Sequence, residues 1–304
     1  MRVLITGGSG LIGSALAREL GKASLDVVVL SRDPSRVKDL PANVRAVRWD
    51  GVSPEGWGDL AEGPDTAIVH LAGEGIADGR WSAERKRRIV DSRVKSSAAV
   101  ALAIRQAKVK PRVLLQGSAV GYYGACGDEL ASEEHPPGTG FLAQVCIDWE
   151  RSTDEVEALG VRRVVLRTGI VLAREGGALP KMALPFRLFA GGPLGNGRQW
   201  VPWIHLADEV GAIRFLLETE AARGPFNLAA PEPVRNRDLG RVLGEVLHRP
   251  SLLPAPAFAL HLALGEMAAM VLEGQRAVPT ALQKLGYTYR FPDLGRALHH
   301  LLDD

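Results

Sequence analysis

The chain has 304 residues and is 46% hydrophobic, which is enough for a sizeable buried core and, by length, for about two domains. With 37 basic and 35 acidic side chains, the net charge of +2 argues against a nucleic-acid partner and against attraction to an acidic membrane. The two cysteines, Cys126 and Cys146, are too few for a disulfide framework or a metal cluster, so we expect no metal.

The chain begins with a predicted strand. Residues 1–6 are typical of the first buried strand of a domain, so we expect no signal peptide there. No apolar run approaches the roughly 20 residues needed to span a bilayer. We therefore expect a cytoplasmic protein with no membrane partner.

A glycine-rich turn, residues 7–13, follows this strand and leads into a predicted helix over 14–20. A strand, a glycine turn and a helix N-terminus in this order form a phosphate cradle. The glycines admit close backbone approach, and the first helical turn has unpaired N–H groups. A tight turn without a ligand is the alternative. We predict a bound dinucleotide, contacted by Thr6, Gly7, Gly10, Leu11, Ile12 and Gly13.

The end of the second predicted strand, residues 26–30, indicates which dinucleotide binds. An NAD site places a carboxylate here for the ribose hydroxyls, whereas this chain has Ser31 and Arg32, which can donate hydrogen bonds to a 2′-phosphate. Asp33, one residue later, argues for NAD. We predict NADP(H), contacted by Ser31 and Arg32, with NAD(H) as the weaker alternative.

Further strands and helices alternate along the chain. Strands are predicted over 44–49, 66–72, 112–115 and 161–166, and helices over 82–106 and 141–159. This alternation predicts a parallel sheet covered on both faces, whose strands end at one ligand-binding rim. Along that rim we expect cofactor contacts from Asp50 (at the adenine amino group), Leu71, Ala72, Gly73, Arg93 and Ser118. For Arg93 a solvated position is an equal alternative. The basic run at 85–88 indicates a solvated helix face in preference to a polyanion site.

The sequence changes character after residue 173. Residues 174–203 are rich in glycine and proline, and prolines interrupt the helical patterns of residues 231–304. We predict a Rossmann-type, doubly wound parallel α/β domain over 1–173, to which 204–230 return. A smaller, mostly helical C-terminal cap is expected from 174–203 and 231–304, and it should bind the substrate. The predicted substrate contacts are Glu74, Arg198, Gln199, Trp200 and His205, although His205 taken alone is more typical of a structural histidine.

Several motifs together resemble those of the extended short-chain dehydrogenases/reductases, the superfamily of nucleotide-sugar epimerases and dehydratases. They are Thr6-Gly7-x-x-Gly10-x-x-Gly13, His70-Leu71-Ala72-Gly73, Ser118 before Tyr123-Gly124, and Trp203-Ile204-His205-x-x-Asp208. Stretches across the whole chain, including residues 117–124 and 273–276, are also similar to one atypical branch. Its members are described as NAD(P)-dependent nucleoside-diphosphate-sugar epimerase-family proteins, and some carry a cell-division inhibitor label.

The resemblance also implies which groups are missing. Extended members use a Tyr-x-x-x-Lys pair as general acid/base in the helix after Ser118, and here that helix opens with residues 141–146, which contain neither. The atypical branch is likewise described as lacking the pair. Ser118, Tyr122 and Tyr123 are the candidate catalytic residues in its place, with packing or turn roles as the alternative.

Three functions are consistent with these features. The first is an NADP(H)-dependent oxidoreductase acting on a small carbonyl or sugar-like substrate, because hydride transfer needs a positioned cofactor and a hydrogen bond to the electrophile. The second is a nucleotide-sugar epimerase, which the missing Tyr/Lys pair argues against. The third is a non-catalytic NADP(H)-binding sensor or scaffold linked to cell division. We favour the first, an enzyme with a small-molecule substrate, and the superfamily also implies a homodimer.

Overall fold

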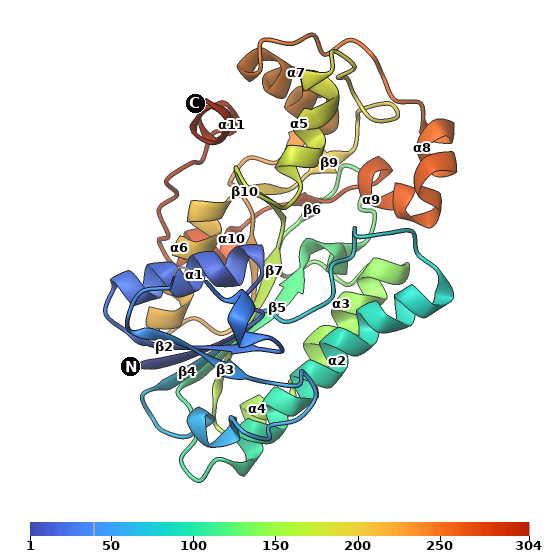
Figure 1. Cartoon of the computed structure of the whole chain (residues 1–304). Coiled ribbons are helices and arrows are strands. Elements are labelled where there is room, and N and C mark those ends of the chain that lie inside the picture. Colours follow the sequence, from blue (N-terminus) through green and yellow to red (C-terminus); the bar gives the residue numbers. More distant parts are fainter. Residues whose placement is uncertain (39, 304) are drawn as a thin grey trace.

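The computed structural model describes residues 1–38 and 40–303, and its centre is one parallel sheet (Figure 1). The strands lie in the order β11-β7-β5-β4-β1-β2-β3, and every neighbouring pair is parallel. The chain leaves β1 toward β2 and β3 and then returns to β4 on the other side of β1. Ligands bind at such a switch point, at the carboxyl ends of the strands. The strands are β1 (Arg2–Thr6), β2 (Asp26–Ser31), β3 (Val44–Arg48), β4 (Thr66–His70), β5 (Val113–Ala119), β7 (Arg162–Thr168) and β11 (Gly224–Leu228).

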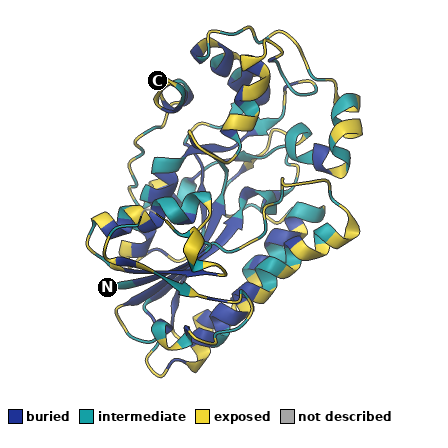
Figure 2. Cartoon of the chain, viewed as in Figure 1, coloured by how far each residue is buried: buried dark blue, intermediate teal, exposed yellow. Residues whose placement is uncertain are grey.

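Helices cover both faces of the sheet (Figure 1). One layer contains α1 (Leu11–Lys22) and α6 (Leu206–Glu218), and the other contains α2 (Ala83–Gln106), α3 (Phe141–Arg151) and α4 (Glu155–Ala158). The strands are therefore apolar on both sides: Val3 and Ile5 are buried in one core, and Leu4 is buried in the other. Figure 2 shows the buried strands between the two helical layers. The predicted fold class is confirmed.

The C-terminal cap has its own apolar core, which includes Phe186, Trp203, Leu243 and Leu298. Its helices are α5 (Leu179–Arg187), α7 (Asn236–Val246), α8 (Ala257–Leu264), α9 (Ala269–Leu272) and α11 (Leu294–Leu302). An antiparallel pair, β9 (Trp200–Val201) with β12 (Val234–Arg235), also belongs to it.

Short segments lie between the cap and the part of the chain that contains the main sheet. Two parallel pairs connect distant parts of the chain: β8 (Ile170–Leu172) with β10 (Trp203–His205), and β6 (Leu130–Ala131) with β13 (Arg276–Ala277). Single 3-10 turns are η1 (Pro34–Arg36), η2 (Gly58–Ala61), η3 (Val120–Tyr123) and η4 (Gly265–Ala268).

Two details differ from the sequence predictions. The cap does not include all of residues 231–304, because α10 (Thr280–Lys284) returns to the main sheet and buries Leu282 in the core beside β11. The helix predicted over 141–159 is interrupted after Arg151, where the buried Thr153 hydroxyl accepts a hydrogen bond from Arg163 Nε at 2.9 Å. Over residues 1–38 and 40–303, the structure contains no helix that is both long and apolar enough to cross a membrane.

Candidate functional site

The glycine turn connects β1 to α1 with very little space between backbone segments. Gly7 has a φ of +69°, and a Cβ on it would lie 2.8 Å from the Leu71 carbonyl oxygen. A Cβ on Gly13 would lie only 2.4 Å from the Gly7 carbonyl oxygen. Positions 7 and 13 therefore require glycine for the turn itself, since any other residue would displace backbone.

Gly10 has a different environment. Among the described residues, a Cβ at this position would meet only the Gly7 carbonyl oxygen, at 3.2 Å, and Gly10 is otherwise exposed. Gly10 is the N-cap residue of α1 and has no side chain that could cap the helix. Across the described residues, the N–H groups of the first helical turn, Leu11, Ile12 and Gly13, have no hydrogen-bond partner. Three free donors beside an open glycine form a cradle of the kind that holds a diphosphate at a helix N-terminus.

Thr6 organises the neighbouring loop after β4. Its Oγ1 accepts hydrogen bonds from the Leu71 and Ala72 N–H groups at 3.1 and 3.2 Å, so its own hydrogen is donated to His70 Nδ1 at 2.7 Å. His70 Nε2 then carries the proton and donates to Ser97 Oγ at 3.0 Å. Thr6 thus fixes Leu71 and Ala72 beside the glycine turn, and its hydroxyl is fully used in doing so.

A pH dependence of stability follows from His70. Burial lowers its pKa to about 3 from an ordinary value of 6.5, so the unfolded chain takes up the proton first as the pH falls. Because the unfolded state binds more protons below pH 6.5, stability should fall from there toward pH 3, by about 2 kcal/mol at pH 5 from this group. Denaturant unfolding at pH 7 and pH 5 measures the loss. His70→Gln should lose less than the wild type, and an equal loss would contradict the assignment.

The residues after β2 leave Arg32 free. The Asp33 carboxylate accepts hydrogen bonds from the backbone N–H and the hydroxyl of Ser35, at 3.1 and 2.6 Å, and so caps η1. The Ser31 hydroxyl donates to the Asp33 carbonyl oxygen at 2.9 Å. Arg32 is exposed and makes no hydrogen bond or ion pair within the described part of the chain. The charged group available at this end of β2 is therefore a guanidinium.

Asp50, predicted at the adenine, is bonded within its own turn. Its carboxylate accepts from the N–H groups of Val52 and Ser53, both at 2.8 Å, and from the Ser53 hydroxyl at 2.7 Å. These hydrogen bonds, that from Val52 first, lower its pKa and keep it ionised.

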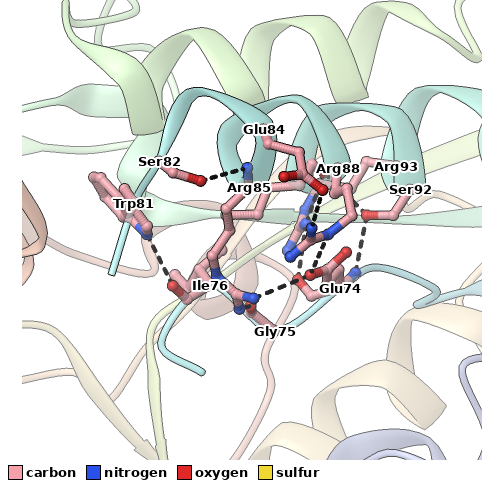
Figure 3. Close-up of polar contacts among 11 residues, drawn as sticks. Glu74, Gly75, Ile76, Trp81, Ser82, Glu84, Arg85, Arg88, Ser92 and Arg93 are labelled. Carbon is pink, nitrogen blue, oxygen red and sulfur yellow. Dashed lines mark hydrogen bonds and ion pairs between the residues drawn. The ribbon is translucent and has the colours of Figure 1, made fainter. Parts of the chain in front are cut away.

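Glu74, a predicted substrate contact, lies in an ion-pair cluster with the N-terminal part of α2 (Figure 3). Its Oε1 is 3.2 Å from Arg85 Nη1 and 3.3 Å from Arg88 Nε, and Arg88 also pairs with Glu84 at 2.9 Å. Two arginines of the basic run at 85–88, Arg85 and Arg88, are therefore paired with acidic neighbours. The cluster holds the loop after β4 against α2.

Ser118 and Tyr123, two of the predicted catalytic residues, are hydrogen-bonded into a buried network. Ser118 Oγ donates to Glu150 Oε1 at 2.6 Å, and Glu150 pairs with Arg167 at 2.9 and 3.0 Å. Tyr123 accepts from Arg167 at 3.1 Å and donates to Asn227 Oδ1 at 2.6 Å. Burial raises the pKa of the Tyr123 phenol to about 12. Neither hydroxyl has a hydrogen left for a substrate in this arrangement.

Tyr122 is the candidate whose phenol is not used elsewhere. Its ring lies over the Arg167 guanidinium, with 3.5 Å from Cζ to the ring centre, and its hydroxyl has no hydrogen-bond partner among the described residues. The cation orders the ring, and the side chain is only partly buried. Although burial opposes it, the Glu150 carboxylate raises the pKa of Arg167, so this cation stays charged.

One face of α3 packs against the turn at Gly121, beside the candidate tyrosines. Leu142 and Cys146, four residues apart, lie 3.6 and 3.7 Å from where a Cβ on Gly121 would be. Phe141 instead packs against Trp81, with ring centres 4.9 Å apart. Burial raises the pKa of the Cys146 thiol to about 11, so this cysteine is a neutral, buried group.

Three of the predicted substrate residues lie together in the cap. Arg198, Gln199 and Trp200 line a cavity of about 380 Å³ with Asp128, Arg235 and Glu273. Trp200 Nε1 donates to Asp128 at 2.9 Å, and Arg235 pairs with the same carboxylate at 2.8 Å. The loop after η3 and the cap therefore meet at this cavity.

His205 does not join this group. It is 3% exposed, its ring stacks on Phe291 at 4.0 Å, and its Nδ1 accepts from the Ala207 N–H at 2.9 Å, which caps α6. Burial lowers its pKa to about 4, with a smaller contribution from His300. The structure therefore assigns His205 a capping and packing role in place of the predicted substrate contact.

Sequence reasoning missed Glu150 and Arg167. Glu150 belongs to the stretch Cys146-x-x-Trp149-Glu150, which also resembles the atypical branch, but that stretch does not indicate a role for its carboxylate. Arg167 is an arginine at the end of an apolar strand, and no spacing connects it to Glu150. Their pairing depends on the packing of α3 against β5, the strand next to β7 in the sheet. Within residues 1–38 and 40–303 there is no group of three or more His, Cys, Asp or Glu that could hold a metal ion.

Comparison with protein families explains this arrangement of glycine turn and parallel sheet. The model of the NAD dependent epimerase/dehydratase family matches residues 3–229, which include all of the main sheet except Arg2 and more than half of the chain. The chain belongs to this family. A domain of unknown function, DUF1731, matches residues 255–301 and includes α8, α9 and α11 of the cap. The predicted family is confirmed.

Full-length relatives carry only the family name. The chain is 37% identical over 308 residues to epimerase family protein YfhF of Bacillus subtilis, covering 100% of this chain and 99% of the relative. It is 40% identical over 299 residues to epimerase family protein ML0860 of Mycobacterium leprae, covering 98% and 94%.

Solved structures show the same fold. Human epimerase family protein SDR39U1, solved with NADPH, is 33% identical with a TM-score of 0.88, and the match covers 99% of each chain. A nucleoside-diphosphate sugar epimerase from Corynebacterium glutamicum is 33% identical with a TM-score of 0.79, over 99% of this chain and 58% of that chain. A UDP-glucose 4-epimerase from Thermus thermophilus, 22% identical with a TM-score of 0.77, shares the fold.

Proposed function

We propose that this epimerase-family protein is an NADP(H)-dependent oxidoreductase that acts on a small carbonyl or sugar-like substrate. The observation that carries the proposal is the end of β2, where Asp33 caps η1 and Arg32 is left as the free charged group. A carboxylate at this point would repel a 2′-phosphate, whereas a guanidinium binds one through paired hydrogen bonds. The NADPH in the human SDR39U1 structure supports the same choice.

The residues at the rim fit a dinucleotide. The open cradle at Gly10, with the free N–H groups of Leu11, Ile12 and Gly13, would hold the diphosphate, and Arg32 would hold the 2′-phosphate. Leu71 and Ala72, fixed by Thr6, would border the cofactor on the β4 side. When bound, this cofactor supplies or accepts a hydride, which no side chain of the protein can do.

Tyr122 is the proposed proton donor to the substrate oxygen. Ser118 and Tyr123 donate their hydroxyl hydrogens to Glu150 and Asn227, so the three candidates from sequence reduce to one. A phenol ordered over Arg167 can donate a proton to an oxygen that gains charge. Ser118 then has a positioning role, because its bond to Glu150 fixes the strand end on which η3 begins.

The substitution Arg32→Ala should weaken NADPH binding far more than NADH binding. Loss of a charge-assisted hydrogen bond to the 2′-phosphate corresponds to about 1.5–3 kcal/mol, while NADH has no phosphate to lose. Calorimetric titration of wild type and variant with both cofactors measures the difference. Arg36→Ala, one helical turn on, is a matched control that removes a nearby exposed arginine. Equal losses for NADPH and NADH in Arg32→Ala would refute the phosphate assignment.

A non-catalytic dinucleotide-binding role is the second candidate. Two of the three candidate hydroxyls donate their hydrogens to other residues of the protein and not to a substrate, which favours this role. An assay that follows the loss of NADPH absorbance in the presence of small aldehydes, ketones and sugars distinguishes the oxidoreductase from the non-catalytic role. Turnover that is lost in Tyr122→Phe supports the oxidoreductase. Tight NADPH binding with no turnover on any compound supports the non-catalytic role, and a requirement for a nucleotide-sugar without net oxidation indicates an epimerase.

A further inference from the structure

Arg93, in the middle of α2, brings a partly buried cation to the rim between β4 and β5. Its Cζ lies 3.1 Å from where a Cβ on Gly73 would be, and 4.8 Å from the centre of the Trp149 ring on α3. Its Nη1 donates to the carbonyl oxygen of Glu74 at 3.0 Å (Figure 3). The same Nη1 donates to the carbonyl oxygen of Ile89, also at 3.0 Å. The guanidinium is therefore fixed by the loop after β4, by its own helix and by α3.

The charge of Arg93 is not paired. Glu74, whose carbonyl oxygen it binds, directs its carboxylate to Arg85 and Arg88, and no carboxylate lies within ion-pair distance of Arg93 in residues 1–38 and 40–303. Burial lowers the pKa of Arg93, which reflects the cost of keeping this charge out of water. A cation that is partly removed from water and not paired favours a partner that arrives with a ligand.

Arg93 also has donors to spare. Its Nε and Nη2 atoms have no hydrogen-bond partner in the part of the chain that the structure describes. Neither of these two atoms is fully buried. Both atoms therefore keep access to open space beside Gly73. Arg162 also lacks a carboxylate partner in the described chain, but it is buried at the N-terminal start of β7, away from the carboxyl ends of the strands. It donates to three carbonyl oxygens, those of Leu216, Leu217 and Ala222.

We propose that Arg93 binds a negatively charged oxygen at the rim through Nε and Nη2, and that this is the reacting oxygen of the substrate. This inference rests on the proposed oxidoreductase function. Two parallel N–H donors of a guanidinium suit an anionic oxygen or a carboxylate. The diphosphate of the cofactor is the other source of such an oxygen. The three free N–H groups of the glycine turn already provide for it, which favours the substrate.

The chemistry of carbonyl reduction needs a group of this kind. A bound, reduced nicotinamide dinucleotide would be oxidised as one of its C–H bonds breaks and the hydride passes to the carbonyl carbon, where a new C–H bond forms. The π electron pair of the C=O bond would then move to the oxygen. That oxygen then takes a proton from Tyr122 or from water. A fixed guanidinium beside the oxygen stabilises the charge while it develops, and it does not itself give up a proton. In this role Arg93 is a catalytic residue, although it transfers no atom.

Calorimetric titration with oxalate, a small dianion, tests the site without requiring the true substrate. Wild type, Arg93→Gln and Arg93→Lys are titrated with oxalate, each with and without saturating NADP⁺, and separately with NADPH. Arg105→Gln is the matched control, because it removes an exposed arginine near the C-terminal end of the same helix. Thermal unfolding shows whether each variant is folded. If Arg93→Gln does not fold, the charge-conserving Arg93→Lys decides, since lysine cannot form the two-donor fork.

We expect oxalate to bind the wild type and Arg105→Gln equally. In Arg93→Gln it should bind about 10- to 100-fold more weakly, as for a lost charge-assisted hydrogen bond, with Arg93→Lys between the two and NADPH affinity unchanged in all. Weaker NADPH binding in Arg93→Gln, with no oxalate binding to the wild type, would overturn the substrate assignment and identify the cofactor diphosphate as the anion. Unchanged affinities for both ligands in a folded Arg93→Gln would overturn the anion site. Oxalate binding that depends on Arg93 in a protein that does not bind NADPH would leave the anion site standing while refuting the proposed function.

Discussion

Gly10→Val is expected to abolish dinucleotide binding and to leave the protein folded. The only atom of the described chain close to a Cβ at position 10 is the Gly7 carbonyl oxygen at 3.2 Å, so the valine projects into the space that a diphosphate would occupy. Blocking access to the N–H groups of Leu11, Ile12 and Gly13 removes several charge-assisted hydrogen bonds, which corresponds to about 100-fold or more in affinity. Calorimetric titration with NADPH measures this loss, and circular dichroism with thermal unfolding verifies the fold.

Two further glycine variants show whether the effect belongs to the cradle. Gly58→Ala also places a Cβ 3.2 Å from its nearest neighbour, Pro54, but lies outside the turn and should bind NADPH like the wild type. Gly13→Val should instead lose stability, because its Cβ would meet the Gly7 backbone at 2.4 Å. Wild-type NADPH affinity in a folded Gly10→Val would mean that the dinucleotide does not use this turn.

Arg167→Met is expected to cause a large loss of stability. Arg167 is 4% exposed and forms two hydrogen bonds to the Glu150 carboxylate, which would be left as an unpaired, mostly buried charge. Removing one partner of a buried ion pair typically costs about 3–5 kcal/mol. Tyr122 and Tyr123 also lose the cation against which they pack. Urea unfolding of wild type and variant at pH 7 measures the difference in free energy of unfolding.

The double variant Glu150→Gln/Arg167→Met separates the charge from the packing. If the cost comes mainly from the unpaired carboxylate, neutralising Glu150 should recover part of the stability that Arg167→Met loses. An Arg105→Met control removes an exposed pair with Glu155 and should change stability by less than about 1 kcal/mol. A loss below about 1 kcal/mol in Arg167→Met would show that the buried network does not hold η3 in place.

The sheet and the glycine turn could be predicted from sequence because both depend on local patterns. The strand at residues 2–6, the glycines at 7, 10 and 13 and the helix after them are adjacent in the chain, and their spacing has one structural meaning. Alternating apolar strands and helices then imply the parallel sheet. The order of the strands and the placement of the rim residues follow from that topology.

The sequence could not show which of the candidate catalytic hydroxyls are available, because their environment depends on residues far away in sequence. Ser118 and Tyr123 stand at the expected strand end, but Glu150 and Asn227, 32 and 104 residues further on, use their hydroxyl hydrogens. Whether a hydroxyl is free depends on such partners, and composition and spacing carry no information about them. His205 is a similar case, since its capping bond is local but Phe291 and His300, which bury it, come from the C-terminal part of the cap.

The most direct measurement is calorimetric titration of the purified, ligand-free protein with NADPH and with NADH under the same conditions. The arrangement of Gly10, Arg32 and Asp33 predicts that NADPH binds at one site per chain and at least about tenfold more tightly than NADH, as for one charge-assisted hydrogen bond to the 2′-phosphate. Equal affinity for both would contradict the role of Arg32. Binding of neither would contradict the dinucleotide site itself, and with it the proposed oxidoreductase.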